Sequence, residues 1–273
     1  SDAATKGIDI ITAVNTYKGE TITKKVQSIV FGKKADYPEI VAGDKGLLMD
    51  VEQDVPADVY YVENNGLYQI YILSDDTIYA PTDCSNMCNG MSNLVSVDTS
   101  NLDVSRTTSM YRMFRDCGKL AAIDVSDWDT SNVTNMRDLF RGCKSLPSVD
   151  VSNWKTGKVE TLIATFQDCI LMTEIDVSNW DTSNVTDMTQ TFNRCNGLKT
   201  LDVSKWDTSN VTSMQLMFQE CLVLPTLDVS NWNTSKVTSM GGMFRGVYAL
   251  KELDVSDWDV SKVTNFQQIF ASG

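Results

Sequence analysis

Residues 202–227 read Asp-Val-Ser-Lys-Trp-Asp-Thr-Ser-Asn-Val-Thr-Ser-Met-Gln-Leu-Met-Phe-Gln-Glu-Cys-Leu-Val-Leu-Pro-Thr-Leu. The opening Asp-Val-Ser triplet recurs with a strict period of 26 residues, and all six tryptophans of the chain occupy the fifth position of a copy. The triplet begins at Asp124, Asp150, Asp176, Asp202, Asp228 and Asp254, after a degenerate copy at Asp98. One copy cannot bury its own apolar face, so a fixed period of this length predicts copies that stack on one another.

Each copy contains two different spacings of apolar residues. At the boundary between copies, Leu146, Val149 and Val151 have the spacing of a short strand, with Asp150 pointing outward. Later in the copy, apolar residues three or one apart predict one face of a helix of about three turns. In the copy that begins at Asp202 these residues are Val211, Met214, Met217, Phe218 and Cys221. The predicted fold class is an α/β repeat solenoid, leucine-rich-repeat-like, with one short parallel strand and one helix per 26-residue repeat.

The whole pattern, Leu-x-x-Leu-Asp-Val-Ser-x-Trp-Asp-Thr-Ser-Asn-Val-Thr-x-Met-x-x-Met-Phe-x-x-Cys, resembles the 26-residue surface-protein repeat of the BspA-like leucine-rich-repeat family. The resemblance covers residues 81–273. It implies a bacterial protein that is secreted or displayed on the cell surface, has no enzymatic activity, and adheres to a host or bacterial macromolecule. The partner implied is a protein or a glycan, and the repeat does not identify which one.

Residues 1–80 lack the repeat and are predicted to form a β-rich N-terminal cap, followed by the solenoid of about seven repeats at 81–273. Strands are expected at 26–31, 46–51, 59–62 and 67–73, where β-branched and aromatic residues gather. Asn64-Asn65-Gly66 is typical of a hairpin turn between the last two.

The composition excludes several functions. The 273 residues include no histidine, which removes every mechanism that needs an imidazole base or ligand. The net charge of −13, from 36 acidic and 23 basic residues, disfavours nucleic acid and anionic membranes as partners. No segment reaches the ~18 consecutive apolar residues of a membrane span, so membrane insertion is not expected. We therefore predict no enzymatic activity, no catalytic residue, no cofactor and no metal site.

Three repeated positions each have two interpretations. The tryptophans could form an exposed strip that stacks on sugars, or large rings that fill the core, which we favour. The cysteines from Cys117 to Cys221 are expected to be buried free thiols, although Cys84 and Cys88 could form a local disulfide. The aspartates that open the copies would repel one another, so either calcium or hydrogen bonds from neighbouring Ser, Thr and backbone N–H groups must compensate; we favour hydrogen bonds.

A partner-binding surface is predicted where the copies differ from one another. The two positions after the cysteine are polar or small in several copies but apolar in others, and such hydrophobicity at the end of an element marks a contact surface, a deeper core or a dimer contact. The candidate partner-binding residues are Ile170, Leu171, Leu222, Val223 and Tyr248. The alternative function is a structural spacer or stalk, possibly stabilised by calcium, that displays another domain.

Overall fold

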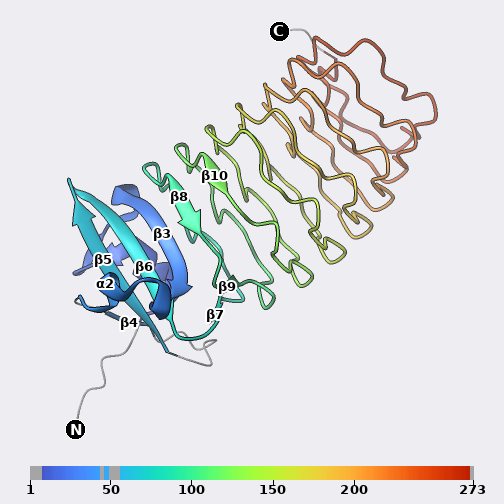
Figure 1. Ribbon diagram of the computed structural model, residues 1–273. Coiled ribbons are helices and arrows are strands. Elements are labelled where there is room, and N and C mark those ends of the chain that lie inside the picture. Colours follow the sequence, from blue (N-terminus) through green and yellow to red (C-terminus); the bar gives the residue numbers. More distant parts are fainter. Residues whose placement is uncertain (1–7, 44–45, 49–55, 271–273) are drawn as a thin grey trace.

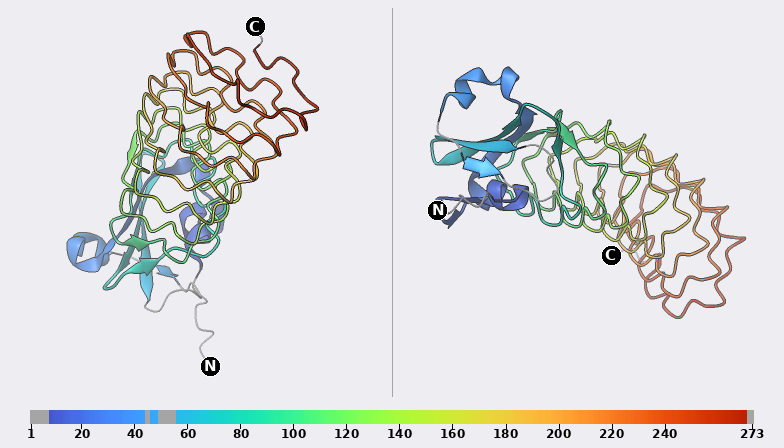
Figure 2. Two further views of the ribbon diagram at one scale, coloured as in Figure 1. Left: turned by 90° about the vertical axis from the view of Figure 1, so that its right-hand side faces the viewer. Right: turned by 90° about the horizontal axis from the view of Figure 1, so that it is seen from below.

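The computed structural model describes residues 8–43, 46–48 and 56–270. A region built on a β-sheet lies at one end, and a single file of similar coils extends from it (Figures 1 and 2). No helix in the described part of the chain has the length and apolar character needed to cross a bilayer.

The N-terminal region contains several short elements besides the strands of its main sheet. They are α1 (Ile10–Asn15), β1 (Thr16–Tyr17), β2 (Glu20–Thr21), η1 (Thr23–Lys25), η2 (Lys34–Asp36) and α2 (Pro38–Val41). Helix α1 begins where the Asp9 carboxylate accepts a hydrogen bond from the Thr12 backbone N–H, which is the usual way to satisfy a free amide at a helix start. Its buried residues, Ile10, Ala13 and Val14, join the core.

The main sheet has the strand order β10-β8-β3-β6-β5-β4. The strands are β3 (Val26–Lys33), β4 (Gly46–Leu48), β5 (Ala57–Asn64), β6 (Leu67–Ser74), β8 (Ser96–Asp98) and β10 (Ala122–Ile123). Strands β5 and β6 form the predicted hairpin, and Asn65 and Gly66 adopt φ angles of 52° and 79° at its turn. The strands predicted at 26–31, 59–62 and 67–73 coincide with β3, β5 and β6; of the one predicted at 46–51, β4 covers 46–48 and the rest lies outside the described residues.

Strand β3 connects the sheet to the stack of coils. It pairs in parallel with β6 on one side and with β8 on the other, and β8 belongs to the first coils, where Ile29 lies opposite Val97. A second small sheet joins β7 (Ile78–Tyr79) to β9 (Leu102–Asp103). The buried apolar side chains of the sheet and of the coils form one continuous cluster. The first coil is therefore covered by β3 instead of facing solvent.

The predicted α/β class, with one strand and one helix per repeat, is wrong. Both α-helices of the described residues, α1 and α2, lie before residue 42, and the coils are built from turns. In the coil that begins at Asp202, the amides of Met217, Gln219 and Cys221 donate to carbonyls three residues earlier. The alternate amides, of Met214, Leu216 and Phe218, donate to the next coil at 2.9 Å. Half of the amides thus bond across coils, whereas a helix would keep them all within itself.

The backbone angles explain why no helix forms. The fifteenth and nineteenth positions of a copy adopt positive φ, as at Leu216 (55°) and Glu220 (56°), and a right-handed helix cannot contain such residues. The expected strand is also reduced: after β10 the described residues form no strand at this position, and the single parallel bridges that join adjacent coils lie at position 12 instead, as at Thr161 and Asp187. The alternation predicted for it remains, since Val149 and Val151 are buried and Asp150 is exposed.

Columns of identical side chains form the core of the stack. Successive phenylalanine rings from Phe114 to Phe270 lie 5.6–6.0 Å apart and almost parallel. Successive indoles from Trp128 to Trp258 lie 6.0–6.5 Å apart, within 4° of parallel. From Trp154 onward, each indole N–H donates to a valine carbonyl of the previous coil, as in Trp180 Nε1 to Val151 O at 3.0 Å. The buried tryptophan N–H therefore has its partner in every such coil.

Candidate binding surface

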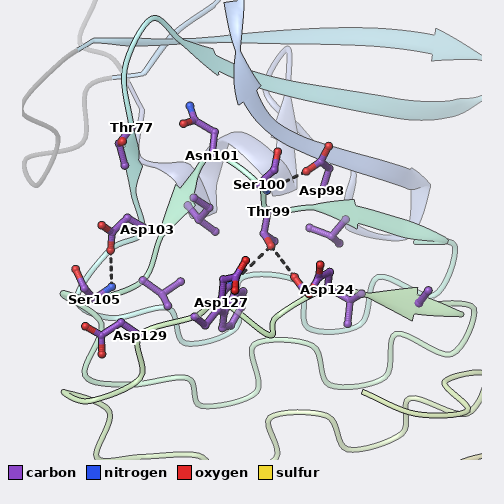
Figure 3. A pocket seen from close by; sticks show the side chains of 16 residues that line it. Thr77, Asp98, Thr99, Ser100, Asn101, Asp103, Ser105, Asp124, Asp127 and Asp129 are labelled. Carbon is purple, nitrogen blue, oxygen red and sulfur yellow. Dashed lines mark hydrogen bonds between the residues drawn. The ribbon is translucent and has the colours of Figure 1, made fainter. Parts of the chain in front are cut away.

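The strand side of the coils carries the aspartates that open each copy, and shallow hollows lie along it. Near the N-terminal end, a hollow of about 850 Å³ is lined by side chains of the first coils (Figure 3). Its acidic residues are Asp98, Asp103, Asp124, Asp127 and Asp129. Thr99 Oγ1 donates to the backbone carbonyl of Asp124 at 3.0 Å across this hollow (Figure 3). The strand side is therefore acidic and open to solvent.

Hydrogen bonds hold these carboxylates in place. Asp150 Oδ1 accepts from the backbone N–H of Ser152 at 3.1 Å and from its hydroxyl at 2.6 Å, and the same pair recurs at Asp124, Asp176, Asp202, Asp228 and Asp254. The Ser152 hydroxyl and, secondarily, its amide hold the pKa of Asp150 below its ordinary value. Among the described residues, no group of three acidic or cysteine side chains is arranged to hold a metal ion. Serine hydroxyl and amide groups thus stabilise the charged aspartates. This agrees with the interpretation that hydrogen bonds compensate the repulsion between them.

The tryptophan and cysteine columns belong to the core. The indoles from Trp128 to Trp232 are only 3–6% exposed, so they cannot form a sugar-stacking strip. All seven cysteines are buried, and no disulfide joins Cys84 to Cys88. Burial raises the pKa of Cys169 and of Cys221 to about 12. These two thiols are therefore protonated at neutral pH, which makes them poor nucleophiles.

The five candidate partner-binding residues lie on the turn edge, which we define as positions 13–22 of each coil. Ile170 (43%), Leu171 (51%), Val223 (45%) and Tyr248 (63%) are exposed, and Leu222 is half-buried. Because the coils stack in register, Leu222 and Val223 are one coil away from Tyr248. Ile170 and Leu171 lie two coils before them.

The coil in between is polar, so the apolar residues do not form one continuous patch. Its equivalent residues are Asn196 and Gly197, and a side chain at Gly197 would come within 2.9 Å of the Ile170 carbonyl oxygen. The Asn196 amide donates to the Glu220 carbonyl at 3.0 Å. Tyr248 borders a hollow of about 310 Å³, which Leu250, Leu253 and Phe270 also line. The structure thus gives two apolar contact areas, one at Ile170 and Leu171 and one around Tyr248.

Sequence reasoning missed a cluster of four arginines on the same edge. The arginine cluster consists of Arg112, Arg115, Arg137 and Arg141, at positions 14, 15 and 18 of two adjacent coils. It surrounds the Asp138 carboxylate, whose side chain is 1% exposed, with nitrogen-to-oxygen distances of 3.3–3.6 Å from three of the four. The available signal was composition, because the chain has only seven arginines and four of them fall within residues 112–141.

The stacked coils, the aligned columns and the solvent-exposed turn edge define a repeat protein whose outer side chains vary over a constant core. A family model described as "Mycoplasma protein of unknown function, DUF285" matches residues 82–200 and again 161–273. These two segments overlap and together extend over the coils, and the chain belongs to this family. No curated protein and no solved structure matches the chain.

Proposed function

We propose that this protein is a non-enzymatic binding protein, secreted or displayed on a bacterial cell surface, that contacts another macromolecule through the turn edge of its coils. The observation that supports this proposal most directly is the exposure of Ile170, Leu171, Val223 and Tyr248 at positions that are polar or small in other coils. Large apolar side chains that are solvated in the free protein favour burial by a partner. The resemblance to BspA-like surface proteins supports the same function and location.

The architecture separates the core from the contact surface. The phenylalanine, tryptophan and cysteine columns use the same side chain in nearly every coil, so the core limits their variation. Positions 21 and 22 follow the cysteine and lie outside these columns, so they tolerate Gly118 and Lys119 in one coil and Ile170 and Leu171 in another. Recognition can therefore diverge without loss of the fold. The partner is a protein or a glycan, and the apolar character of the two contact areas favours a protein.

Hydrogen exchange of the chain, with and without a panel of extracellular proteins and glycans, tests this proposal. We expect one partner to protect the segments around residues 170–171 or 222–248, and Ile170→Ser with Leu171→Ser, or Tyr248→Ser, to weaken its binding. Val95→Ser is the matched control, because Val95 is 42% exposed and lies outside the candidate residues. Protection confined to the strand side, or equal loss in the Val95 variant, would contradict the proposal.

The runner-up is a spacer that holds another domain away from the cell. The continuous core from β3 to the last coil favours the spacer function, since a rod with one uninterrupted core has no hinge at which it could bend. A spacer would bind none of the panel, and serine substitutions at either contact area would leave its function unchanged.

A further inference from the structure

The last coil of the described chain, residues 254–270, has a neighbouring coil on one side only (Figures 1 and 2). Its open side, which we call the end face, exposes Val260 (42%), Phe266 (44%) and Phe270 (58%). Phe270 stacks on Phe244 at 5.6 Å, and its outer side packs on no other ring among the described residues. Terminal repeats of a stack ordinarily carry a polar outer face, which keeps them soluble. The end face is apolar instead, which is typical of a contact surface.

The end face departs from the repeat at two positions. At position 7, the five coils before it have a threonine whose hydroxyl donates to a carbonyl of the next coil: Thr130, Thr156, Thr182, Thr208 and Thr234. The last coil has Val260 there, and it has Phe266 at position 13, where the six coils before it have methionine or leucine. Both changes add apolar surface, and the first removes the hydroxyl that would bond another ordinary coil. The end face is therefore suited to a segment that differs from the repeat.

The backbone of the end face presents hydrogen-bond donors. From position 13 to position 19, each backbone hydrogen bond between coils runs from an amide of one coil to a carbonyl of the next. The last coil accepts three such bonds, each at 2.9 Å, from the amides of Met240, Gly242 and Phe244. Its own equivalent amides have no acceptor among the described residues; they belong to Phe266, Gln268 and Phe270. An open row of this kind is a template for pairing with another chain, and here the partner must supply carbonyls at alternate residues.

The hollow of about 310 Å³ adjoins the end face, because Phe270 belongs to both. Leu250 and Leu253, at positions 23 and 26 of their coil, also line this hollow and are half-buried. Leu224 and Leu227, their equivalents one coil earlier, are buried. Apolar side chains of an added segment would bury Leu250 and Leu253 in the same way.

A second copy of this chain does not match the end face. Two end faces placed against each other would set donors against donors. At the other end of the stack, helix α1 lies over the equivalent stretch of the first coil, since Asn15 Nδ2 donates to the Met87 carbonyl at 2.9 Å. An extended segment, by contrast, presents carbonyls at alternate residues along one edge, and the addition of such a segment to an open edge is a common mode of peptide recognition.

We propose that the end face binds an extended segment of another protein, which accepts hydrogen bonds from the three amides and packs apolar side chains on Phe266 and Phe270. This inference rests on the proposed function and names the kind of partner for the contact area around Tyr248, because the hollow belongs to that area. Regularly spaced carbonyls are a property of polypeptides, so a glycan does not match the row of amides. Main-chain hydrogen bonds supply affinity in this mode of binding, and the apolar side chains supply specificity.

An NMR titration of the chain with a synthetic peptide of residues 236–248 tests the proposal. This peptide is a stand-in for the partner, because its carbonyls accept from the preceding coil in the stack, as Gly241 O does from Leu216 N at 2.9 Å. Gly242 and Gly246 occupy its two positions of positive φ, so it reaches the coil conformation at little cost. We expect it to bind and to slow hydrogen exchange at the amides of the end face. The peptide of reversed sequence should bind at least about tenfold more weakly.

Two variants of the chain locate the binding. Phe266→Ser and Phe270→Ala should each weaken the affinity for the peptide about tenfold, because each removes an apolar contact of the end face. Both side chains are exposed, so either variant decides the result if the other does not fold. Ile170→Ser is the matched control, since Ile170 is 43% exposed and lies in the other contact area; its affinity should change less than about twofold.

Four results would overturn the proposal: no binding of the peptide, equal affinity for the reversed peptide, an equal loss in Ile170→Ser, or tighter binding of cellohexaose than of the peptide. A dimer of the chain alone that Phe270→Ala abolishes in light scattering would also overturn it, because a second copy would then occupy the end face. The proposed function stands in each case if Ile170→Ser with Leu171→Ser weakens binding of a partner from the panel. The two failures are therefore distinguishable.

Discussion

In the N-terminal region the packing contacts do not repeat along the chain, whereas in the coils each core side chain packs on its own equivalent one coil away. Tyr17 stacks on Tyr61 with ring centroids 4.3 Å apart, and Tyr68 meets Tyr17 edge-on. These contacts occur once. In the stack, Phe140, Phe166 and Phe192 repeat a single contact at 6.0 and 5.7 Å.

The two regions therefore differ in how a local defect spreads. A residue in the sheet belongs to one set of contacts, but a residue inside a column contributes to the interfaces on both sides of its coil. The backbone hydrogen bonds also join each coil to its neighbours, since every other amide of the turn edge bonds to the next coil. Stability in the stack is then a sum of coils and of interfaces between neighbours, and the position of a change along the column should decide its cost.

Phe166→Ala should produce the largest effect. Phe166 is fully buried, with a phenylalanine on each side and Trp180 at 5.9 Å, so truncation removes two stacked contacts and leaves a cavity. We expect a loss of about 3–5 kcal/mol in the free energy of unfolding, measured by urea denaturation. Phe270→Ala is the control, because Phe270 is 58% exposed and stacks on one side only; its cost should stay below about 1 kcal/mol. Equal costs at both sites would break the proposed dependence on position.

Thr182→Val should have the next largest effect. Thr182 is 1% exposed, and its Oγ1 donates to the Asp207 carbonyl of the next coil at 2.9 Å. Valine keeps the shape but leaves that carbonyl without this donor, which should cost about 1–3 kcal/mol in thermal or urea unfolding. Thr186→Val in the same coil is the control: Thr186 is exposed, its bond to the Glu160 carbonyl is longer at 3.3 Å, and the change should stay within about 0.5 kcal/mol.

The sequence predicts the composition of the core better than the shape of the backbone. The period identifies which residues share a column, and the structure confirms that the tryptophans and cysteines are buried. The helix was wrongly predicted because successive turns with hydrogen bonds over three residues place apolar side chains at the same three-residue spacing. The glycines at 142, 242 and 246 carry the signal against a helix, since they recur at the two positions that adopt positive φ.

The surface was predicted only in part for a different reason. Exposure of Ile170, Leu171, Val223 and Tyr248 follows from their place outside the columns, which the repeat makes visible. The arginine cluster depends on contacts between side chains of adjacent coils, such as Arg112 with Asp138. A single copy of the repeat does not show which side chains meet across the stack until the coil register is known.

Gln190→Gly should have a smaller effect, and one of opposite sign. Gln190 adopts φ of 59°, at a position where another coil has Gly242, so glycine relieves the strain of the left-handed conformation. We expect a gain of about 1 kcal/mol in urea denaturation. Gln215→Gly is the control, since Gln215 is not among the positive-φ residues and glycine there should destabilise by about 0.5–1 kcal/mol. A loss of stability in both variants would show that the backbone of the turn edge is unstrained.

The smallest effect is expected on the strand side, where the contact that recurs in each coil is a hydrogen bond from serine to aspartate instead of the packing of one ring on another. Ser152→Ala removes the hydroxyl that holds the pKa of Asp150 below its ordinary value, so that pKa should rise toward the ordinary value of an aspartate in an NMR titration of the carboxyl group. Because the lowered pKa belongs to the folded state, its stabilising contribution is present above the unfolded pKa and disappears as the pH falls through the folded value. The melting temperature of the variant should therefore lie slightly below that of the wild type at pH ~7, and the gap should close once the pH has fallen below the pKa of Asp150 in the folded protein. Ser148→Ala is the control, because Ser148 is exposed on the same side of the same region and makes no contact with Asp150 among the hydrogen bonds of the described residues. A gap that persists at low pH would show that Ser152 contributes through packing, and the strand side would then resemble the columns instead of differing from them.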